Sequence, residues 1–218
     1  MKIRIAFCII IFFLSPGCAH WVELQDLPQG TEDFLPSEVG TRIPAILKNI
    51  DLRINGSAIE PPEEFRMLVM QKLRRTYVFR EVATLGESGM IKDRERGVYL
   101  GLSINGVADT NEMSNLVRFA ANCATLFLLS SALPYKDQFD VTMMLKAVRP
   151  DGAEHYYRSR IQGAAYYRFF GGEQARTKAQ DEVVTRGLNA LMRQLMKDVD
   201  FFAVQTTQQR QPQGDSQA

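Results

Sequence analysis

The side chains that most often carry out chemistry are few in this sequence. Its 218 residues include two His and three Cys, the types from which many metal and acid–base sites are built. His155 has no second His or Cys at ligand spacing, so we expect it to be structural. The run GESG at residues 86–89 lacks the spacing of a G-x-S-x-G elbow, and no Walker loop or G-x-G-x-x-G run occurs. We therefore predict no metal site, no cofactor and no catalytic residue.

A second group of candidate residues combines arginines with aromatic rings. Residues 156–170 contain four Tyr, two Phe and three Arg. Such side chains can stack on sugars, bases or lipid headgroups, although they are also typical of a strand with one packed and one solvated face. The residues we select for partner or membrane binding are Tyr156, Arg158, Tyr166 and Arg168.

The segment Leu116–Leu133 is the most apolar stretch after the amino terminus. Arg118 and Asn122 interrupt it, and an Arg near the bilayer centre costs about 2.5–3.5 kcal/mol, so a membrane span is disfavoured. We favour a buried core element, in which Cys123 is a small hydrophobe. The alternative is an exposed flap that touches a membrane or a partner. Its binding residues would be Leu126, Phe127, Leu128 and Leu129.

The amino terminus has the pattern of a secretory signal peptide. Lys2 and Arg4 precede an apolar run from Ile5 to Leu14, and Ser15-Pro16-Gly17 breaks this run before Cys18. The run has ten residues, whereas a membrane-spanning helix needs about 20. We therefore expect residues 1–17 to be removed.

The cleavage region resembles the lipobox of bacterial lipoproteins, because Cys18 follows Gly17 and other small or apolar residues. The resemblance implies that Cys18 is diacylated and becomes the new amino terminus, anchoring the chain in a membrane. In these lipoproteins an Asp after the Cys favours inner-membrane retention, so Ala19 implies an outer-membrane protein that faces the periplasm. Ordinary cleavage after Gly17 or Ala19 is the alternative.

Composition indicates one ordinary globular domain, with 45% hydrophobic and 23% charged residues. The 26 basic and 25 acidic residues leave a net charge of +1, which provides no surplus for phosphates, so we expect no nucleic-acid partner. Three prolines and two glycines punctuate the stretch after Cys18, and the carboxy terminus is polar and Gln-rich. We predict a signal peptide at 1–17, a lipidated tether at 18–44, a periplasmic domain at 45–204 and a disordered tail at 205–218.

Hydrophobic periodicity predicts the elements of that domain. Alternation predicts strands at residues 46–54, 77–85, 98–105, 139–147 and 153–161. Repeats at three and four residues predict helices at 61–75 and 173–202. Asn55-Gly56 and Pro150-Asp151-Gly152 supply turns. The expected fold is α+β, a mixed sheet of about five strands with two amphipathic helices on one face.

This order of elements over residues 45–200 resembles, loosely, the small periplasmic domain of accessory lipoproteins of curli secretion, exopolysaccharide export and ABC-type transport. Our leading hypothesis is a non-catalytic outer-membrane lipoprotein whose periplasmic domain binds a partner in envelope assembly, export or transport. One alternative is a periplasmic hydrolase of cell-wall or polysaccharide bonds, since paired carboxylates leave no sequence signature. Another is a lipid-interacting module that uses residues 116–133.

Overall fold

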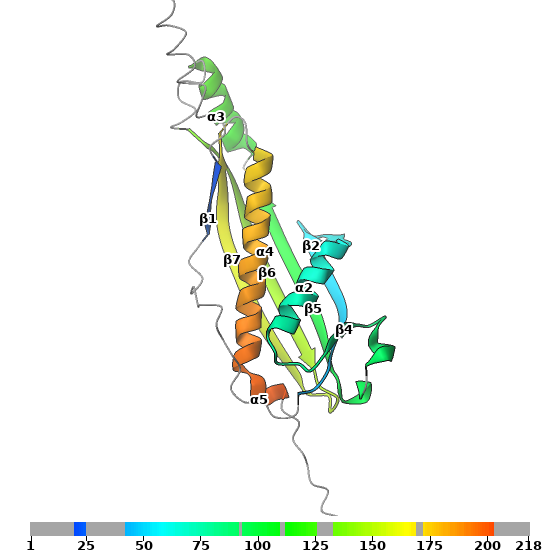
Figure 1. The fold of residues 1–218 in the computed structure, drawn as a ribbon. Helices are drawn as coiled ribbons and strands as arrows, with labels where there is room; N and C mark the ends of the chain where they lie inside the picture. The colour runs from blue at the N-terminus through cyan, green and yellow to red at the C-terminus, as the bar shows by residue number, and fades with distance from the viewer. Residues whose placement is uncertain are drawn as a thin grey trace, which may run out of the picture.

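The computed structural model describes residues 20–24, 42–91, 93–109, 112–125, 133–168 and 172–202. These residues form one twisted sheet with a long helix lying along it (Figure 1). The α+β class predicted from the sequence is confirmed. The signal peptide, Cys18, Leu126–Leu129 and the carboxy-terminal tail lie outside the described residues.

The sheet is mixed and has seven strands among the described residues, two more than predicted. The strands are β1 (His20–Leu24), β2 (Ala45–Ile54), β3 (Ser57–Ile59), β4 (Val82–Thr84), β5 (Val98–Asp109), β6 (Tyr135–Val148) and β7 (Glu154–Tyr167). Their order is β1-β7-β6-β5-β2-β3, and β4 pairs with β2. β2 is parallel to β4 and β5, because a helical crossover separates them in the chain, whereas the other pairs are antiparallel.

Two tight turns set the register of the hairpins, as their sequences predict. Asn55 and Gly56 have φ of 51° and 81°, the left-handed conformation that a two-residue hairpin requires. Gly152 has φ of 85° at the turn between β6 and β7, where its N–H donates to the carbonyl of Arg149 at 3.0 Å. β6 and β7 then pair along their whole length, from Val148–Glu154 to Tyr135–Tyr167.

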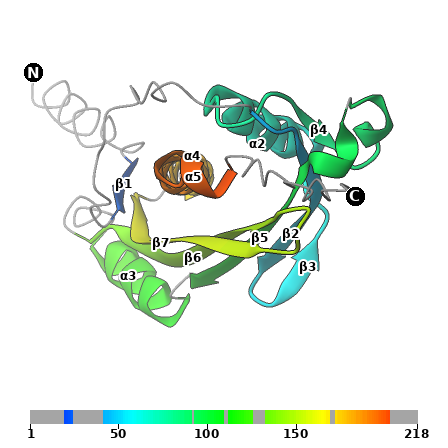
Figure 2. The same cartoon turned by 90° about the horizontal axis from the view of Figure 1, so that it is seen from below.

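Helices α2 (Glu63–Arg75) and α4 (Gly172–Lys197) cover one face of the sheet, and α5 (Val199–Phe202) follows α4. Figure 2 shows these three helices on the same side of the strands. The main core lies between them and the sheet, with Leu188, Leu191 and Leu195 of α4 fully buried. The apolar stripes predicted for both helices are therefore confirmed. No helix in the described ranges is long and apolar enough to cross a membrane.

Gly187 lets α4 lie close to the sheet. A Cβ atom at this position would lie 2.5 Å from Met143 Sδ and 2.9 Å from Ile161 Cδ1. Glycine costs roughly 1 kcal/mol relative to alanine inside a helix. The close packing of α4 on β6 and β7 accounts for a residue that helix propensity alone disfavours.

The predicted strand at residues 77–85 is wrong in extent, because only Val82–Thr84 is a strand. Tyr77 has φ of 55°, a left-handed conformation that ends α2 and is incompatible with an extended strand. Val78 and Phe79 are nevertheless buried. Their apolar character reflects insertion into the core as a bend, rather than position in the sheet.

β1 lies in the stretch for which the sequence predicted a tether. His20–Leu24 pairs with Gly163–Tyr167 of β7. Val22 and Leu24 pack on the helix-covered side, whereas Trp21 stacks on Tyr166 on the other. The alternation of polar and apolar side chains in HWVEL is that of an edge strand. A long flexible tether therefore does not separate Cys18 from the sheet.

Candidate functional site

The face of the sheet opposite α4, here called the open face, carries three of the predicted binding residues. Tyr156, Arg158 and Tyr166 all occupy even-numbered positions of β7, so their side chains share this face. Tyr156 donates to Glu154 Oε2 at 2.6 Å, and Lys146 Nζ lies 2.6 Å from Glu154 Oε1. These contacts lower the pKa of Glu154 and raise the pKa of Lys146. The contact between Lys146 and Glu154 joins side chains of neighbouring strands, as expected where aromatic residues belong to a strand with one packed and one solvated face.

Arg158 lies on β7, whereas Arg168 lies beyond its end. The backbone of Arg158 exchanges two hydrogen bonds with the side-chain amide of Gln194, at 3.2 and 2.8 Å. This amide covers the edge of β7 where β1 no longer pairs with it. Arg168 follows the last residue of β7 and is half-buried. The four predicted residues therefore extend along the strand and do not converge on one point.

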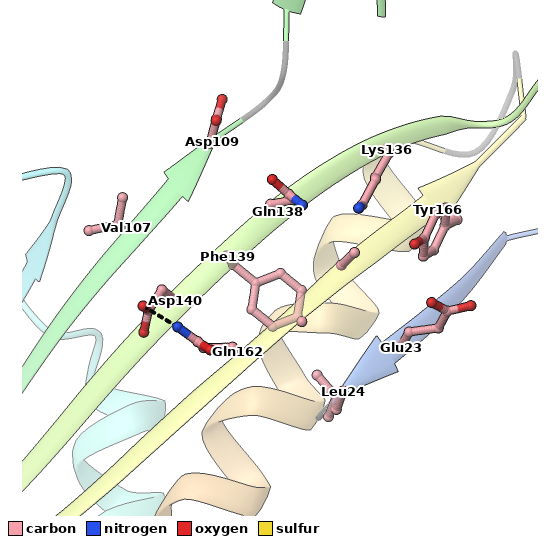
Figure 3. Close-up of a pocket in the computed structure, with 12 residues that line it drawn as sticks. Glu23, Leu24, Val107, Asp109, Lys136, Gln138, Phe139, Asp140, Gln162 and Tyr166 are labelled. Carbon is pink, nitrogen blue, oxygen red and sulfur yellow. Dashed lines mark hydrogen bonds between the residues drawn. The ribbon is translucent and has the colours of Figure 1, made fainter. Parts of the chain in front are cut away.

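A hollow of about 570 Å³ opens on the open face where β1, β7, β6 and β5 run side by side. Figure 3 shows Glu23 on β1, Tyr166 on β7 and Lys136 on β6 around it. Trp21 stacks on Tyr166 with ring centroids 5.0 Å apart, and Lys136 Nζ lies 5.7 Å from the Tyr166 ring centroid. Burial, followed by the Glu23 carboxylate, raises the pKa of Tyr166.

Asp140, another residue of the hollow, is held by neighbouring donors. Arg160 Nε donates to Asp140 Oδ1 at 3.0 Å. Gln162 Nε2 donates to Asp140 Oδ2 at 2.7 Å, the hydrogen bond drawn in Figure 3. These hydrogen bonds, Arg160 first, hold the pKa of Asp140 below its usual range. The carboxylate is thus ionised and paired at neutral pH, which suits a structural or recognition role.

A second and larger hollow, about 770 Å³, lies on the helix-covered side between α2 and α4. We call it the interhelical groove. Its lining is mainly apolar: Phe65 and Leu68 on α2, Val183 and Val184 on α4, and Ile104, Val141 and Met143 on the sheet. Lys72 Nζ donates to Asn189 Oδ1 at 2.7 Å and joins the two helices beyond the groove. Towards the start of α2 and the middle of α4 no such bridge occurs among the described residues.

Charged residues surround the interhelical groove. Arg176 Nε lies 2.7 Å from Asp137 Oδ2, an ion pair that also reaches the Tyr167 hydroxyl. The hydrogen bond from Arg176 to Asp137 raises the pKa of Arg176. Glu64 and Asp181 also line the groove and are exposed. Neither the arrangement of these charged residues nor the separation of the helices could be read from the sequence, although its repeats at three and four residues correctly predicted both helices.

Helix α3 (Glu112–Ala124) corrects the interpretation of the apolar segment. It lies on the side of the sheet opposite α4, near one end of the strands (Figures 1 and 2). Leu116 and Val117 are 60% and 63% exposed, so this part of the segment is not core. Cys123 is also exposed, contrary to the predicted buried thiol. The predicted residues Leu126, Phe127, Leu128 and Leu129 lie outside the described residues.

The polar residues of α3 bind the domain. Asn115 Nδ2 donates to the Lys136 carbonyl at 3.3 Å, and Asn115 Oδ1 accepts from the Lys136 N–H at 3.1 Å. Arg118 Nη1 donates to the Pro134 carbonyl at 2.5 Å. Arg118, the residue that argued against a membrane span, therefore binds a backbone carbonyl of the domain.

His155, expected to be structural, lies 3.4 Å from Asp198 Oδ2 through Nδ1 and stacks on Tyr157. Within the described ranges no cluster of three or more His, Cys, Asp or Glu is arranged to hold a metal ion. The candidate sites among the described residues are therefore the two hollows and the exposed stripe of α3.

The sequence matches no protein-family model and no curated protein. Among solved structures, a neuraminyllactose-binding hemagglutinin homolog from Helicobacter pylori aligns with a TM-score of 0.43 and 15% identity, covering 80% of this chain and 89% of that chain. The rare lipoprotein B from Shewanella oneidensis aligns with a TM-score of 0.39 and 11% identity, covering 70% and 96%. The PelC dodecamer from Paraburkholderia phytofirmans aligns at 0.29 and 9%, covering 81% and 96%. Similarities at this level carry no conclusion about function.

Proposed function

We propose that this chain is a non-catalytic lipoprotein of the cell envelope, anchored in the outer membrane through Cys18, whose periplasmic domain binds an envelope protein. The lipobox-like sequence before Cys18 supports the anchor. The interhelical groove is the observation that supports the binding role. A groove of about 770 Å³ lined mainly by apolar side chains is within the range that proteins use for specific ligands.

The shape and charge of the groove favour an amphipathic segment of a partner protein. Two helices form its walls, and a third helix can lay apolar residues between such walls. The basic residues at the rim are already paired, Arg53 with Asp51 and Arg176 with Asp137. The rim also contains exposed acidic residues, Glu64 and Asp181. A segment with an apolar face flanked by Lys or Arg therefore complements it.

The carboxylates of Asp140 and Glu23 in the open-face hollow both accept hydrogen bonds from neighbouring side chains. A hydrolase that uses two carboxylates needs one of them protonated as a general acid. The pKa of Asp140 is lowered, first by Arg160 and then by Gln162, so Asp140 does not suit the role of that acid. Glu23 Oε1 accepts a hydrogen bond from the Trp21 indole at 3.2 Å. We therefore assign these residues to the architecture of the open face.

Site-specific photocrosslinking in intact cells tests the binding role. A photoreactive residue at Gln180, which lines the groove and is exposed, is expected to crosslink to one envelope protein. Lys178 is the matched control, since it is exposed on the same helix but does not line the groove. Equal crosslinking from both positions, or none from Gln180, would contradict the assignment.

A second variant connects the crosslink to the groove itself. Ile59 lines the groove and is 43% exposed, so Ile59→Glu is expected to keep the fold while placing a charge in the binding surface. The crosslink from Gln180 should then be lost, and the melting temperature should stay close to that of the parent. An unchanged crosslink would mean that the partner contacts α4 without entering the groove.

A further inference from the structure

The geometry points to a membrane contact made by α3: this helix lies in the lipid surface to which the chain is anchored, with Met113, Leu116 and Val117 against the acyl chains. This inference depends on the proposed anchor at Cys18 and adds an orientation to it. The domain is then held with one end of its sheet on the membrane.

The first observation is that α3 directs its apolar face outward, whereas α2 and α4 direct theirs to the core. Met113, Leu116 and Val117 recur at three and four residues, which places them on one face. They are 74%, 60% and 63% exposed, and Ala120 and Ala124 extend the same exposed stripe. A helix on a soluble domain normally turns its apolar face to the core. Apolar residues directed outward are instead typical of a helix that lies in a lipid interface.

The second observation is that the polar face of α3 is fixed to the protein. Asn115 pairs with both backbone groups of Lys136, and Arg118 binds the carbonyl of Pro134. Asn122, on the same side as these two residues, is fully buried. Rotating the helix to bury its apolar stripe would break the hydrogen bonds of Asn115 and Arg118, so these bonds set the outward direction of the stripe.

The third observation is that the anchor and α3 lie at the same end of the sheet. His20 pairs with Tyr167, which in turn pairs with Tyr135, next to the residues that bind α3. Cys18 precedes His20 by two residues, and two residues span at most about 7 Å. Adjacent strands are about 4.8 Å apart. The diacylated residue therefore lies within roughly 20 Å of the attachment of α3, which leaves no slack to lift this end from the bilayer.

Side chains near the anchor fit the headgroup region. Trp21 stacks on Tyr166, and Lys136 Nζ lies over the Tyr166 ring at 5.7 Å. Trp and Tyr are enriched at membrane–water interfaces, where an amphipathic ring is favourable. Trp21 is thus packed on the domain and also placed beside the lipid, three residues after the anchor. A bilayer accounts for the position of this cluster, of the anchor and of the apolar stripe together.

Depth-dependent fluorescence quenching tests the orientation. After processing and acylation of Cys18, Cys123 is the one free thiol of the three cysteines, and it is exposed on α3. A bimane fluorophore on Cys123 of the lipidated protein, in phosphatidylethanolamine–phosphatidylglycerol vesicles, is expected to lose most of its fluorescence to lipids with a nitroxide on the acyl chain. The control is Pro150→Cys with Cys123→Ala, in the turn beyond the far end of β6, a strand that itself spans about 44 Å. Its label should remain unquenched.

The outcomes separate the orientation from the anchor. An acylated, vesicle-bound protein whose Cys123 label is as unquenched as the control would overturn the membrane contact, leaving the stripe to a protein partner. Mass spectrometry without acyl groups on Cys18 would overturn the anchor and the orientation together. Val117→Glu, at an exposed position, should keep the fold and reduce the quenching, and unchanged quenching in this variant would also contradict the contact.

Discussion

Gly163 lies where β1 meets β7, and a side chain there would collide with backbone. A Cβ atom would press on the carbonyl oxygen of Glu23 and lie 2.8 Å from Phe139 Cζ. The backbone of β1 is held by its pairing with β7 and cannot move away without losing that pairing. Gly163→Ala is therefore expected to displace β1 and lower the melting temperature. Hydrogen exchange should become faster at the amides of β1. Retention of both the melting temperature and β1 protection would refute this account.

Gly187→Ala provides the comparison. Its Cβ would meet the ends of Met143 and Ile161, which can adjust at an overpacking cost of about 1–3 kcal/mol. Alanine also gains about 1 kcal/mol of helix propensity. We expect a smaller loss of stability than for Gly163→Ala, measured by chemical denaturation. A larger loss would mean that Met143 cannot move.

Tyr157 is expected to make the free energy of unfolding fall as the pH rises above about 10. It is buried and donates its hydroxyl to Asp198 Oδ2 at 2.8 Å. Burial and then this carboxylate raise the pKa of Tyr157. Because the pKa of Tyr157 is higher in the folded state, the stability that Tyr157 contributes is complete below its unfolded-state pKa of about 10. This stability is lost as the pH rises towards and through the folded-state pKa. Tyr157→Phe should therefore show a shallower loss of denaturation midpoint between about pH 10 and 11.

The same substitution should reduce stability at neutral pH, by about 1 kcal/mol for one hydrogen bond. Asp198 keeps His155 as a neighbour at 3.4 Å, which limits the loss. Parallel pH curves for Tyr157→Phe and the parent would show that this tyrosine does not titrate with unfolding.

Among the elements, α4 contributes most directly to the core. Leu191 and Leu195 have no exposed surface, so truncation to alanine leaves a cavity that costs about 2–5 kcal/mol. We expect Leu191→Ala and Leu195→Ala each to lower the melting temperature clearly. Thr185→Ala, at an exposed position of the same helix, is the control and should have little effect. Equal stability of all three variants would contradict the packing of α4 on the sheet.

Helix α3 is expected to be energetically separate from that core, since the main core contains no residue of α3. Asn115→Ala removes its hydrogen bonds to Lys136 and Asp137. Hydrogen exchange in α3 should become faster, while the global melting temperature hardly changes. Ser114→Ala, at an exposed neighbouring position, is the control. A global loss of stability in Asn115→Ala would show that α3 and the core unfold together.

The elements that the sequence predicted best are those with one buried face and one solvent-exposed face. In β5, Val98, Leu100 and Leu102 are buried and alternate with less buried residues, so period-two alternation is visible. β1 was missed because five residues give a weak pattern, and nearby prolines and glycines favoured a tether. β3 has three residues, too few for periodicity.

The apolar segment and the interhelical groove could not be predicted for a different reason. The apolar character of Leu116 and Val117 shows that their exposure to water is unfavourable. It does not show whether the core of the domain, a lipid or a partner protein covers them. The outward stripe follows from the polar attachments of Asn115 and Arg118, which are long-range contacts. The groove likewise depends on the spacing between α2 and α4, which their separate patterns do not contain.

For the whole molecule, lipidation predicts membrane retention. Cys18→Ser removes the thiol that would carry the diacylglycerol, and each buried CH₂ contributes about 0.8 kcal/mol. In cell fractionation with metabolic acyl labelling, we expect the parent to be labelled and retained in the membrane, and the variant to be unlabelled and released far more readily. A parent without label and a variant that sediments with the membrane as firmly as the parent would contradict the anchor.

The pairing of β1 with β7 also determines how the molecule would carry mechanical load. With Cys18 held in the membrane, a pull on the domain reaches the sheet through His20, at the first residue of β1. Its hydrogen bonds to β7 run across the strand direction, so a pull along the strand loads the whole ladder in shear instead of opening it one bond at a time. The five-residue pairing from His20–Tyr167 to Leu24–Gly163 would act as a mechanical clamp, and Gly163→Ala should lower the rupture force in single-molecule pulling from Cys18.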